Sequence, residues 1–279
     1  MPGIRKTDEG PRDGPPLLFI HGYAACLEFW DKQVPYLVER GFRVLRMDLP
    51  GHGGSALPPN NDFSAETFSR AVFDALDEMG IERVALVGHS AGGGMVQALY
   101  HLAPERVYGL CLVSTTACPV KKYRQRADGT WRVSTSITQS LKWLFAAPVM
   151  YLFHGPLRRC LPVQLPGVFG PGFPAEEARY WMELVLNSSG TTLVKMVPVI
   201  RRFDATAKLK DIAVPTLIFH GEVDTVLPWT HGAYMAATIP EAQFHLVPRV
   251  GHMVMAERPE FFNETLADWA ERVWERAAG

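Results

Sequence analysis

The sequence of 279 residues has no long hydrophobic run and almost no net charge. Its longest apolar stretch, Leu141 to Phe153, contains Lys142 and Pro148 and is too short to span a bilayer, so we expect no transmembrane helix. With a formal net charge of −1, the chain has no overall electrostatic attraction for polyanions, so we expect no binding to nucleic acid. Because 47% of the residues are hydrophobic, the chain can fill a large core, which predicts a soluble globular protein.

Cysteine pairs and metal-ligand patterns are also missing. Cys26, Cys111, Cys118 and Cys160 form no CxxC pair, and the N-terminus lacks the basic and apolar segments of a secretion signal. We therefore predict free thiols and a cytoplasmic location. No HExxH or comparable ligand spacing occurs, so the sequence predicts neither a metal site nor a cofactor.

The chain does contain a regular alternation of short apolar runs and longer amphipathic stretches. The runs have the length of buried parallel strands and lie at residues 17–20, 42–45, 84–87, 110–113, 216–219 and 244–247. Stretches of helical length lie at residues 29–40, 65–79, 91–102, 229–238 and 259–276. This alternation predicts an α/β fold with a mostly parallel, doubly wound sheet.

The alternation is interrupted between residues 117 and 208. We predict that residues 1–117 and 208–279 form the α/β core, and that residues 118–207 form a mostly helical cap inserted over the sheet. The inserted region is rich in proline and aromatic residues. It holds 12 lysine and arginine residues against five aspartate and glutamate residues, a net charge of +7, whereas the remainder carries −8.

A strand-to-helix junction at Gly88-His-Ser-Ala-Gly-Gly93 presents Ser90 as a candidate nucleophile. A strand that turns abruptly into a helix leaves no room for side chains beside the turn, and Gly88 and Gly92 provide that room. The turn is expected to hold Ser90 in a strained conformation at the carboxyl edge of the sheet, with the helix dipole aimed at the group it attacks. The alternative is that Ser90 is only a structural residue of the turn. Its strained conformation would then serve no function.

A serine nucleophile needs a base, and the base needs an orienting carboxylate. We select His252 as the base because it lies between the last strand and the final helix. Asp224 follows the preceding strand and is the candidate carboxylate; the alternatives are that it caps a helix and that Glu222 takes its place. The other histidines near the motifs are predicted to organise loops: His21, His52, His89 and His220.

Five motifs occur in this order along the chain: Phe19-Ile-His-Gly-Tyr23, Asp48-Leu-Pro-Gly-His-Gly-Gly-Ser55, Gly88-His-Ser-Ala-Gly-Gly93, Gly221-Glu-Val-Asp224 and Gly251-His252. In these motifs and their order, the sequence resembles the α/β-hydrolase family from about residue 17 to the C-terminus. The resemblance implies that the backbone amides of Tyr23 and Ala91 form an oxyanion hole, and that residues 118–207 are the cap domain that shapes the substrate pocket. The family usually has two strands before its His-Gly strand, whereas the sixteen residues before Leu17 have room for one.

With these roles, the sequence predicts a serine hydrolase that cleaves a carboxylic ester through an acyl-enzyme. The serine argues against the haloalkane dehalogenases and epoxide hydrolases of this fold, which use aspartate at that position. Other chemistries stay open, because the fold does not define the reaction. They are a carbon–carbon bond hydrolase of the meta-cleavage type, a cofactor-free perhydrolase, acyl transfer to an alcohol, and a ligand receptor with little turnover.

The aromatic residues of the cap suggest the kind of substrate. They supply more apolar surface than a small polar ester needs, which predicts a small-molecule ester with an apolar acyl or aryl group. About half of these aromatics are expected to pack the cap onto the core instead. The expected pocket residues are Trp143, Phe145, Tyr151, Phe153 and Trp181.

The same region suggests where in the cell the protein acts. The stretch from Ser140 to Phe153 is apolar on nearly every side, and Arg158 and Arg159 follow it. Together with the basic charge of the cap, this pattern suggests peripheral contact with an anionic membrane surface. The alternative is a helix buried against the core or in a dimer interface, and the sequence leaves the oligomeric state open.

Overall fold

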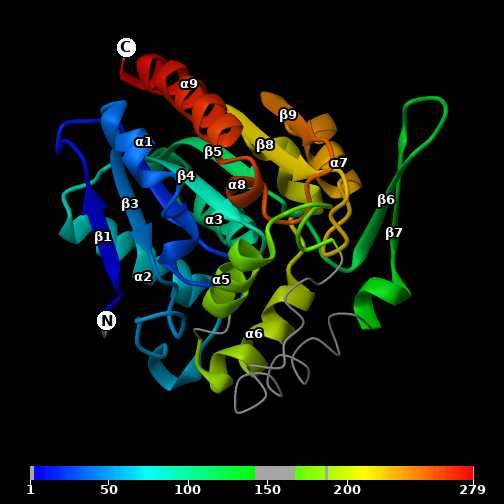
Figure 1. The fold of residues 1–279 in the computed structure, drawn as a ribbon, viewed down its shortest axis with the longest axis horizontal. Coiled ribbons are helices and arrows are strands. Elements are labelled where there is room, and N and C mark those ends of the chain that lie inside the picture. Colours follow the sequence, from blue (N-terminus) through cyan, green and yellow to red (C-terminus); the bar gives the residue numbers. More distant parts are fainter. Residues whose placement is uncertain (1–2, 142–166, 186–187, 279) are drawn as a thin grey trace.

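The computed structural model describes residues 3–141, 167–185 and 188–278. These residues form a seven-stranded sheet in the order β1-β3-β2-β4-β5-β8-β9, with helices on both faces (Figure 1). β1 pairs antiparallel with β3, and the other neighbouring strands are parallel. The strands are β1 (Lys6–Glu9), β2 (Pro16–Ile20), β3 (Arg43–Met47), β4 (Val84–His89), β5 (Val107–Val113), β8 (Thr216–Gly221) and β9 (Ala242–Val247).

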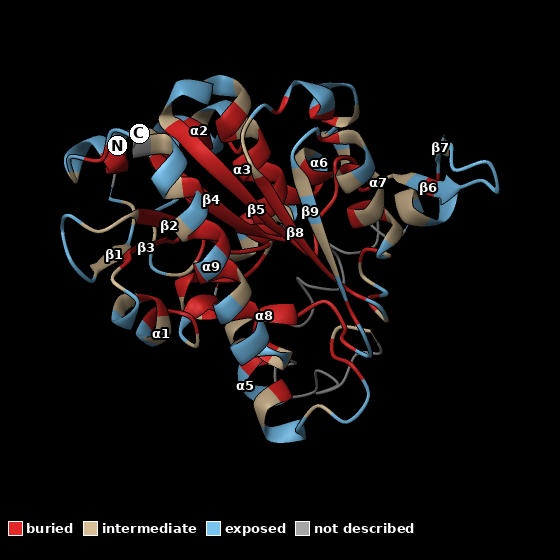
Figure 2. Ribbon diagram, turned by 90° about the horizontal axis from the view of Figure 1, so that it is seen from above, coloured by how far each residue is buried: buried red, intermediate tan, exposed pale blue. Residues whose placement is uncertain are grey.

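The predicted α/β fold is confirmed. Each of the six predicted apolar runs overlaps one parallel strand, and β2 to β5 and β8 are buried along their whole length (Figure 2). Such continuous apolar runs are typical of strands that are covered on both faces. The short N-terminal segment supplies one strand, β1, which closes the edge of the sheet beside β3.

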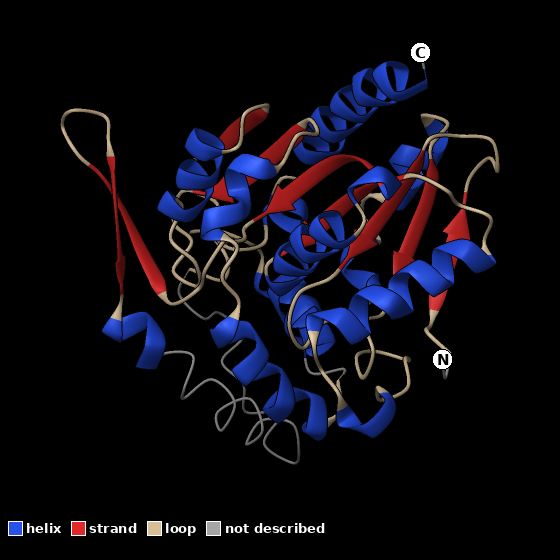
Figure 3. Ribbon diagram, turned by 180° about the vertical axis from the view of Figure 1, so that it is seen from behind, coloured by secondary structure: helices blue, strands red, loops and turns tan. Residues whose placement is uncertain are grey.

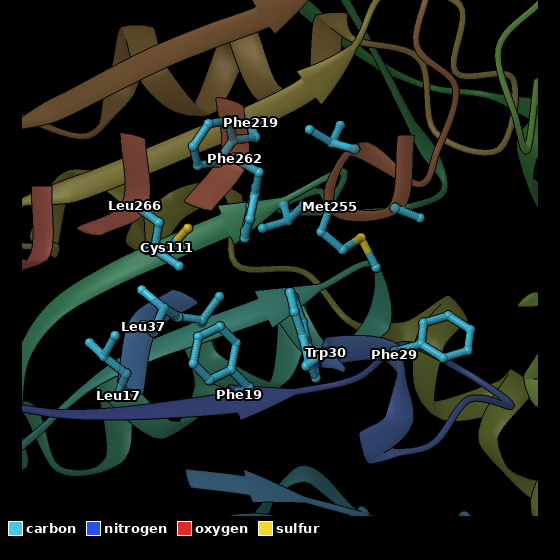
Figure 4. Close-up of a cluster of buried hydrophobic side chains, with 14 of the residues drawn as sticks. Leu17, Phe19, Phe29, Trp30, Leu37, Cys111, Phe219, Met255, Phe262 and Leu266 are labelled. Carbon is cyan, nitrogen blue, oxygen red and sulfur yellow. The ribbon is translucent and has the colours of Figure 1, made fainter. Parts of the chain in front are cut away.

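Two hydrophobic clusters attach the helices to the sheet. α1 and α9 pack on one face, where Phe19, Trp30 and Phe262 lie together (Figure 4). α2, α3 and α7 pack on the other face. The helices are α1 (Val34–Glu39), α2 (Ala65–Glu78), α3 (Ala91–Leu102), α5 (Ala175–Val185), α6 (Gly190–Arg202), α7 (Thr230–Thr238), α8 (Val254–Glu257) and α9 (Pro259–Ala278).

The predicted helix over residues 29–40 is divided in two. A 3-10 turn covers Leu27–Trp30, and α1 begins only at Val34. Pro35 explains this start, because proline lacks an N–H and fits best in the first turn of a helix. The other four predicted helices agree with α2, α3, α7 and α9 to within a few residues.

The inserted region differs from the expected mostly helical cap. Its first part is an antiparallel hairpin of β6 (Lys121–Gln125) and β7 (Trp131–Thr135), which stands apart from the central sheet (Figure 3). The chain reverses at Gly129, whose φ of 82° is one that glycine adopts without strain. Helices α5 and α6 follow later in the region, as expected. The division into a core and a separate cap domain stays a prediction.

Candidate active site

Ser90 lies at the junction between β4 and α3, at the carboxyl edge of the sheet. Its backbone has φ 53° and ψ −119°, a conformation that is strained for any residue with a side chain. The end of β5 and the residues that follow it hold Ser90 there. The Ser90 N–H donates to the carbonyl of Val113 at 2.9 Å, and the hydroxyl of Thr115 donates to the carbonyl of Ser90 at 2.6 Å.

The glycines around Ser90 allow backbone to touch backbone. A Cβ atom on Gly88 would lie 2.5 Å from the carbonyl oxygen of Gly92. A Cβ on Gly92 would lie 2.4 Å from the carbonyl oxygen of His21. Both distances are far below van der Waals contact, so only glycine fits. The sequence pattern suggested the same reason, that the turn leaves no room for side chains at residues 88 and 92.

Asp224 and His252 meet at the same edge of the sheet. Asp224 follows β8 and His252 follows β9, and Nδ1 of His252 lies 2.7 Å from Oδ2 of Asp224. The other oxygen, Oδ1, accepts the N–H groups of Val226 at 2.8 Å and Leu227 at 2.9 Å. Asp224 therefore fixes its own loop with one oxygen and holds His252 with the other. Because a carboxylate can only accept, Nδ1 of His252 carries a proton, and in the neutral form of the ring it is Nε2 that has the lone pair.

The charge of Asp224 is stabilised despite its burial. Burial alone would raise the pKa of Asp224, but His252 and His220 hold it well below its usual range. Nε2 of His220 lies 3.3 Å from Oδ2 of Asp224 and 2.8 Å from the carbonyl of Leu227. Glu222, the alternative carboxylate, is exposed and accepts the N–H of Arg249 at 3.0 Å.

His89, the residue before Ser90, links the serine turn to the loop of His252. Its Nε2 donates to the carbonyl oxygen of His252 at 3.1 Å, and the two imidazole rings are 4.8 Å apart. Burial lowers the pKa of His89 to about 3, so the ring is neutral at physiological pH. Among the described residues, no hydrogen bond joins the hydroxyl of Ser90 to His252. The structure thus pairs His252 with Asp224 and places both beside the Ser90 turn.

Tyr23 and Ala91, which are predicted to form an oxyanion hole, lie in segments that adjoin Ser90, and their role stays a prediction. Tyr23 lies in the turn after β2, and a Cβ on its neighbour Gly22 would be 3.2 Å from Cβ of Ser90. Ala91 is the first residue of α3, where backbone N–H groups have no partner within the helix. Within the described ranges, neither N–H donates a hydrogen bond. The hydroxyl of Tyr23 donates to the carbonyl of Leu193 on α6 at 2.5 Å.

A cavity opens beside Ser90, between α3 and α6. Its walls are almost entirely apolar, and the small residues of α3 leave the space that the side chains of α6 close from the other side. Sequence reasoning missed the α6 wall. The helical spacing of residues 196, 199, 200 and 203 indicates an apolar face, but not what that face meets. The lining residues are Ala65, Ser90, Ala91, Gly94, Met95, Ala98, Thr115, Thr116, Pro119, Met196, Val199, Ile200, Phe203 and Leu227.

The expected aromatic pocket residues do not line this cavity where the structure describes them. Trp181 is only 1% exposed and packs edge-on against Phe29, with the ring centres 5.4 Å apart. It therefore belongs to the hydrophobic core around α5. The other four expected residues lie outside the described ranges: Trp143, Phe145, Tyr151 and Phe153. Most of the apolar stretch that suggested membrane contact lies outside them as well.

The motif around Asp48 organises the loops beside the site. Asp48 accepts the N–H of Leu27 at 2.6 Å and that of Gly54 at 2.8 Å. His21 accepts the N–H of Leu49 at 3.0 Å, and its ring lies 5.1 Å from that of His52. These contacts fit the loop-organising role expected of both histidines. Burial lowers the pKa of His21 to about 4 and that of His52 to about 3.

The described parts of the chain contain neither a metal-binding cluster nor a membrane-spanning helix. No group of three or more histidine, cysteine, aspartate or glutamate side chains there could hold a metal ion. None of the described helices is both long and apolar enough to cross a bilayer.

Comparison with known proteins identifies the family. Residues 15–259 match the family model of the alpha/beta hydrolase fold, so the chain belongs to the alpha/beta-hydrolase family. It is 30% identical over 259 residues to pimeloyl-(acyl-carrier protein) methyl ester esterase of Nitrosomonas europaea, covering 90% of this chain and 93% of that protein. It is 27% identical over 271 residues to a non-heme chloroperoxidase of Streptomyces lividans, covering 93% and 92%. The resemblance predicted from the five motifs is confirmed.

The solved structures agree with this assignment at the level of the fold. The structure of an esterase from Exiguobacterium antarcticum superposes with a TM-score of 0.80 at 22% sequence identity, covering 96% of this chain and 95% of that one. The protein is therefore an alpha/beta hydrolase by fold and family, with esterases among its relatives.

Proposed function

We propose that the protein is a serine hydrolase that cleaves carboxylic esters with an apolar acyl or aryl group. The observation that carries the proposal is the buried Asp224–His252 pair beside the strained Ser90, at the mouth of an apolar cavity. The relative from Nitrosomonas europaea, a methyl ester esterase, supports the same reaction class.

In the proposed mechanism, Nε2 of His252 removes the proton of the Ser90 hydroxyl, and the oxygen attacks the ester carbonyl. The charge of Asp224 stabilises the imidazolium that forms. The amides of Tyr23 and Ala91 hold the oxyanion, and each such donor contributes about 100-fold to 1000-fold in rate. His252 then protonates the leaving alcohol, and a water molecule, activated by His252, releases the acid and restores Ser90.

The cavity favours an apolar substrate group. Ser90 and Ala91 lie at its wall, so a group joined to the reacting carbonyl can extend directly into it. Burial of that group contributes about 0.8 kcal/mol for each methylene removed from water. A polar group of the same size would lose its hydration without gaining a hydrogen-bond partner.

A panel of p-nitrophenyl esters of increasing acyl length, with a vinylogous diketone beside it, tests the proposal. We expect turnover of the esters, with a preference for acyl chains longer than acetyl, and no cleavage of the diketone. Cleavage of the diketone without ester turnover would instead establish a carbon–carbon hydrolase. Binding of these compounds without any turnover would establish a receptor.

A further inference from the structure

One carboxylate fastens the loop of His252 to residues 167–170 of the inserted region. Glu257 is the last residue of α8, the short helix that follows His252. Its Oε1 accepts the N–H of Gly251 at 2.9 Å, and its Oε2 accepts the N–H of Gly170 at 2.7 Å. A single side chain thus joins the residue before His252 to a segment that lies far away in the sequence.

A second set of contacts joins the same two segments. The N–H of His252 donates to the carbonyl of Val168 at 2.9 Å. A Cβ on Gly170 would lie 2.0 Å from the carbonyl oxygen of Arg249, and a Cβ on Gly251 would lie 2.7 Å from that of Val168. The segment 167–170 therefore rests directly on the His252 loop, backbone against backbone.

These contacts fix the two peptide groups that precede the His252 side chain. Glu257 holds the N–H of Gly251, and Val168 holds the N–H of His252 itself. Burial raises the pKa of Glu257, and the N–H groups of Gly170 and Gly251 act in the opposite direction. Both oxygens face N–H donors, so both must act as acceptors.

We propose that Glu257 is a positioning residue that keeps His252 in its contact with Asp224 by holding the amides of Gly251 and Gly170. The inference rests on the proposed role of His252 as the base. Glu257 has no contact with the cavity beside Ser90, so its effect on the reaction passes through the His252 loop.

Glu257→Gln tests this role with little change of shape. Glutamine has one carbonyl oxygen and one NH₂ group, so one of the two amides would face another donor in place of an acceptor. Glu222→Gln is the matched control. Glu222 belongs to the same group of loops, but within the described ranges it accepts a single N–H, that of Arg249, which the glutamine carbonyl can still accept.

The variants are compared by kcat, KM and the rate at which a fluorophosphonate labels Ser90, at a temperature where each is fully folded. For Glu257→Gln we expect kcat to fall about 10-fold to 100-fold, because small misplacements of catalytic groups have effects of this size. KM should stay unchanged, and labelling should slow by the same factor. Glu222→Gln should match the wild type in all three.

Other outcomes overturn the proposal. If Glu257→Gln melts at a lower temperature but retains the wild-type kcat and labelling rate, Glu257 is structural only. A rise in KM alone would assign it to substrate binding. Should Glu257→Gln fail to fold, Glu257→Asp, which retains two acceptors on a shorter side chain, takes its place, and an unchanged kcat again overturns the role.

His252→Ala separates this inference from the proposed function. An active His252→Ala variant would overturn the assignment of the base, and the role of Glu257 with it. An inactive His252→Ala variant beside an unaffected Glu257→Gln variant would leave the proposed function intact and remove only the positioning role.

Discussion

Asp224 makes both structural contacts and the contact on which its proposed chemical role depends. One of its oxygens accepts two backbone N–H groups of its own loop, and the other accepts the Nδ1–H of His252. From the sequence, Asp224 was predicted to orient the base, with helix capping as the alternative. In the structure, the same side chain makes cap-like contacts and also contacts His252. This arrangement fixes the direction from which the carboxylate meets the imidazole.

Asp224→Asn should lower kcat by about 10⁴-fold, as amide replacement of such an orienting carboxylate does elsewhere. The amide can present its NH₂ group to Nδ1 of His252, which would leave the other ring nitrogen protonated and unable to act as a base. Ester turnover and circular dichroism measure the effect and confirm that the variant is folded. Activity within about tenfold of the wild type would contradict the assignment of Asp224.

At the scale of elements, α3 and α6 together define the proposed substrate cavity. α3 contributes small residues, including Gly94 and Ala98, and α6 contributes larger ones, including Met196 and Ile200. The start of α6 is also fastened beside the site. Thr192 donates its hydroxyl to the carbonyl of Gly51 at 2.7 Å, and Tyr23 donates to Leu193.

Ala98→Leu should shorten the cavity, because the larger side chain would fill space that lies along α3 from Ser90. We expect kcat/KM for the longest acyl esters to fall by about tenfold or more relative to the acetyl ester. Ala237→Leu, on an exposed position of α7, is the control with the same substitution. An unchanged chain-length profile in Ala98→Leu would show that the acyl group binds elsewhere.

These elements also show what the sequence could and could not predict. The serine turn was predictable because its cause is local: the glycines and the apolar run are adjacent in the chain. The α6 wall of the cavity was not predictable from the sequence. The pattern of α6 indicates an amphipathic helix but does not indicate which element its apolar face contacts. Aromatic composition misled the choice of Trp181, since an aromatic residue in the core and one in a pocket look alike in sequence.

The hairpin of β6 and β7 escaped prediction for a related reason. Its strands carry mostly exposed polar and charged residues, so they lack the apolar runs that mark the central strands. Tyr123 is the exception, since it is buried and stacks on Tyr234 of α7 with ring centres 4.4 Å apart. One buried residue in the two strands together is too weak a signal for a period-two pattern.

For the whole molecule, the buried neutral histidines predict how stability depends on pH. Burial lowers the pKa of His21 to about 4 and that of His52 and His89 to about 3, whereas in the unfolded chain they titrate near about 6.5. Between these values the unfolded state binds more protons than the folded state. The free energy of unfolding should therefore fall as the pH falls below about 6.5, by up to about 1.4 kcal/mol per pH unit for each histidine.

Urea unfolding at a series of pH values from neutral to mildly acidic measures this slope. His52→Gln removes one of the three groups, so the slope of that variant should be shallower than that of the wild type. A free energy of unfolding that stays constant or increases over this range would contradict neutral burial of the three histidines.

The central claim is that Ser90 is a nucleophile activated by the His252–Asp224 pair. Reaction with a fluorophosphonate, followed by mass spectrometry of the labelled peptides, tests it most directly. The account predicts one label per chain, on Ser90, with no label in Ser90→Ala and much slower labelling in His252→Ala. A label on another residue, or labelling of Ser90→Ala at the wild-type rate, would contradict it.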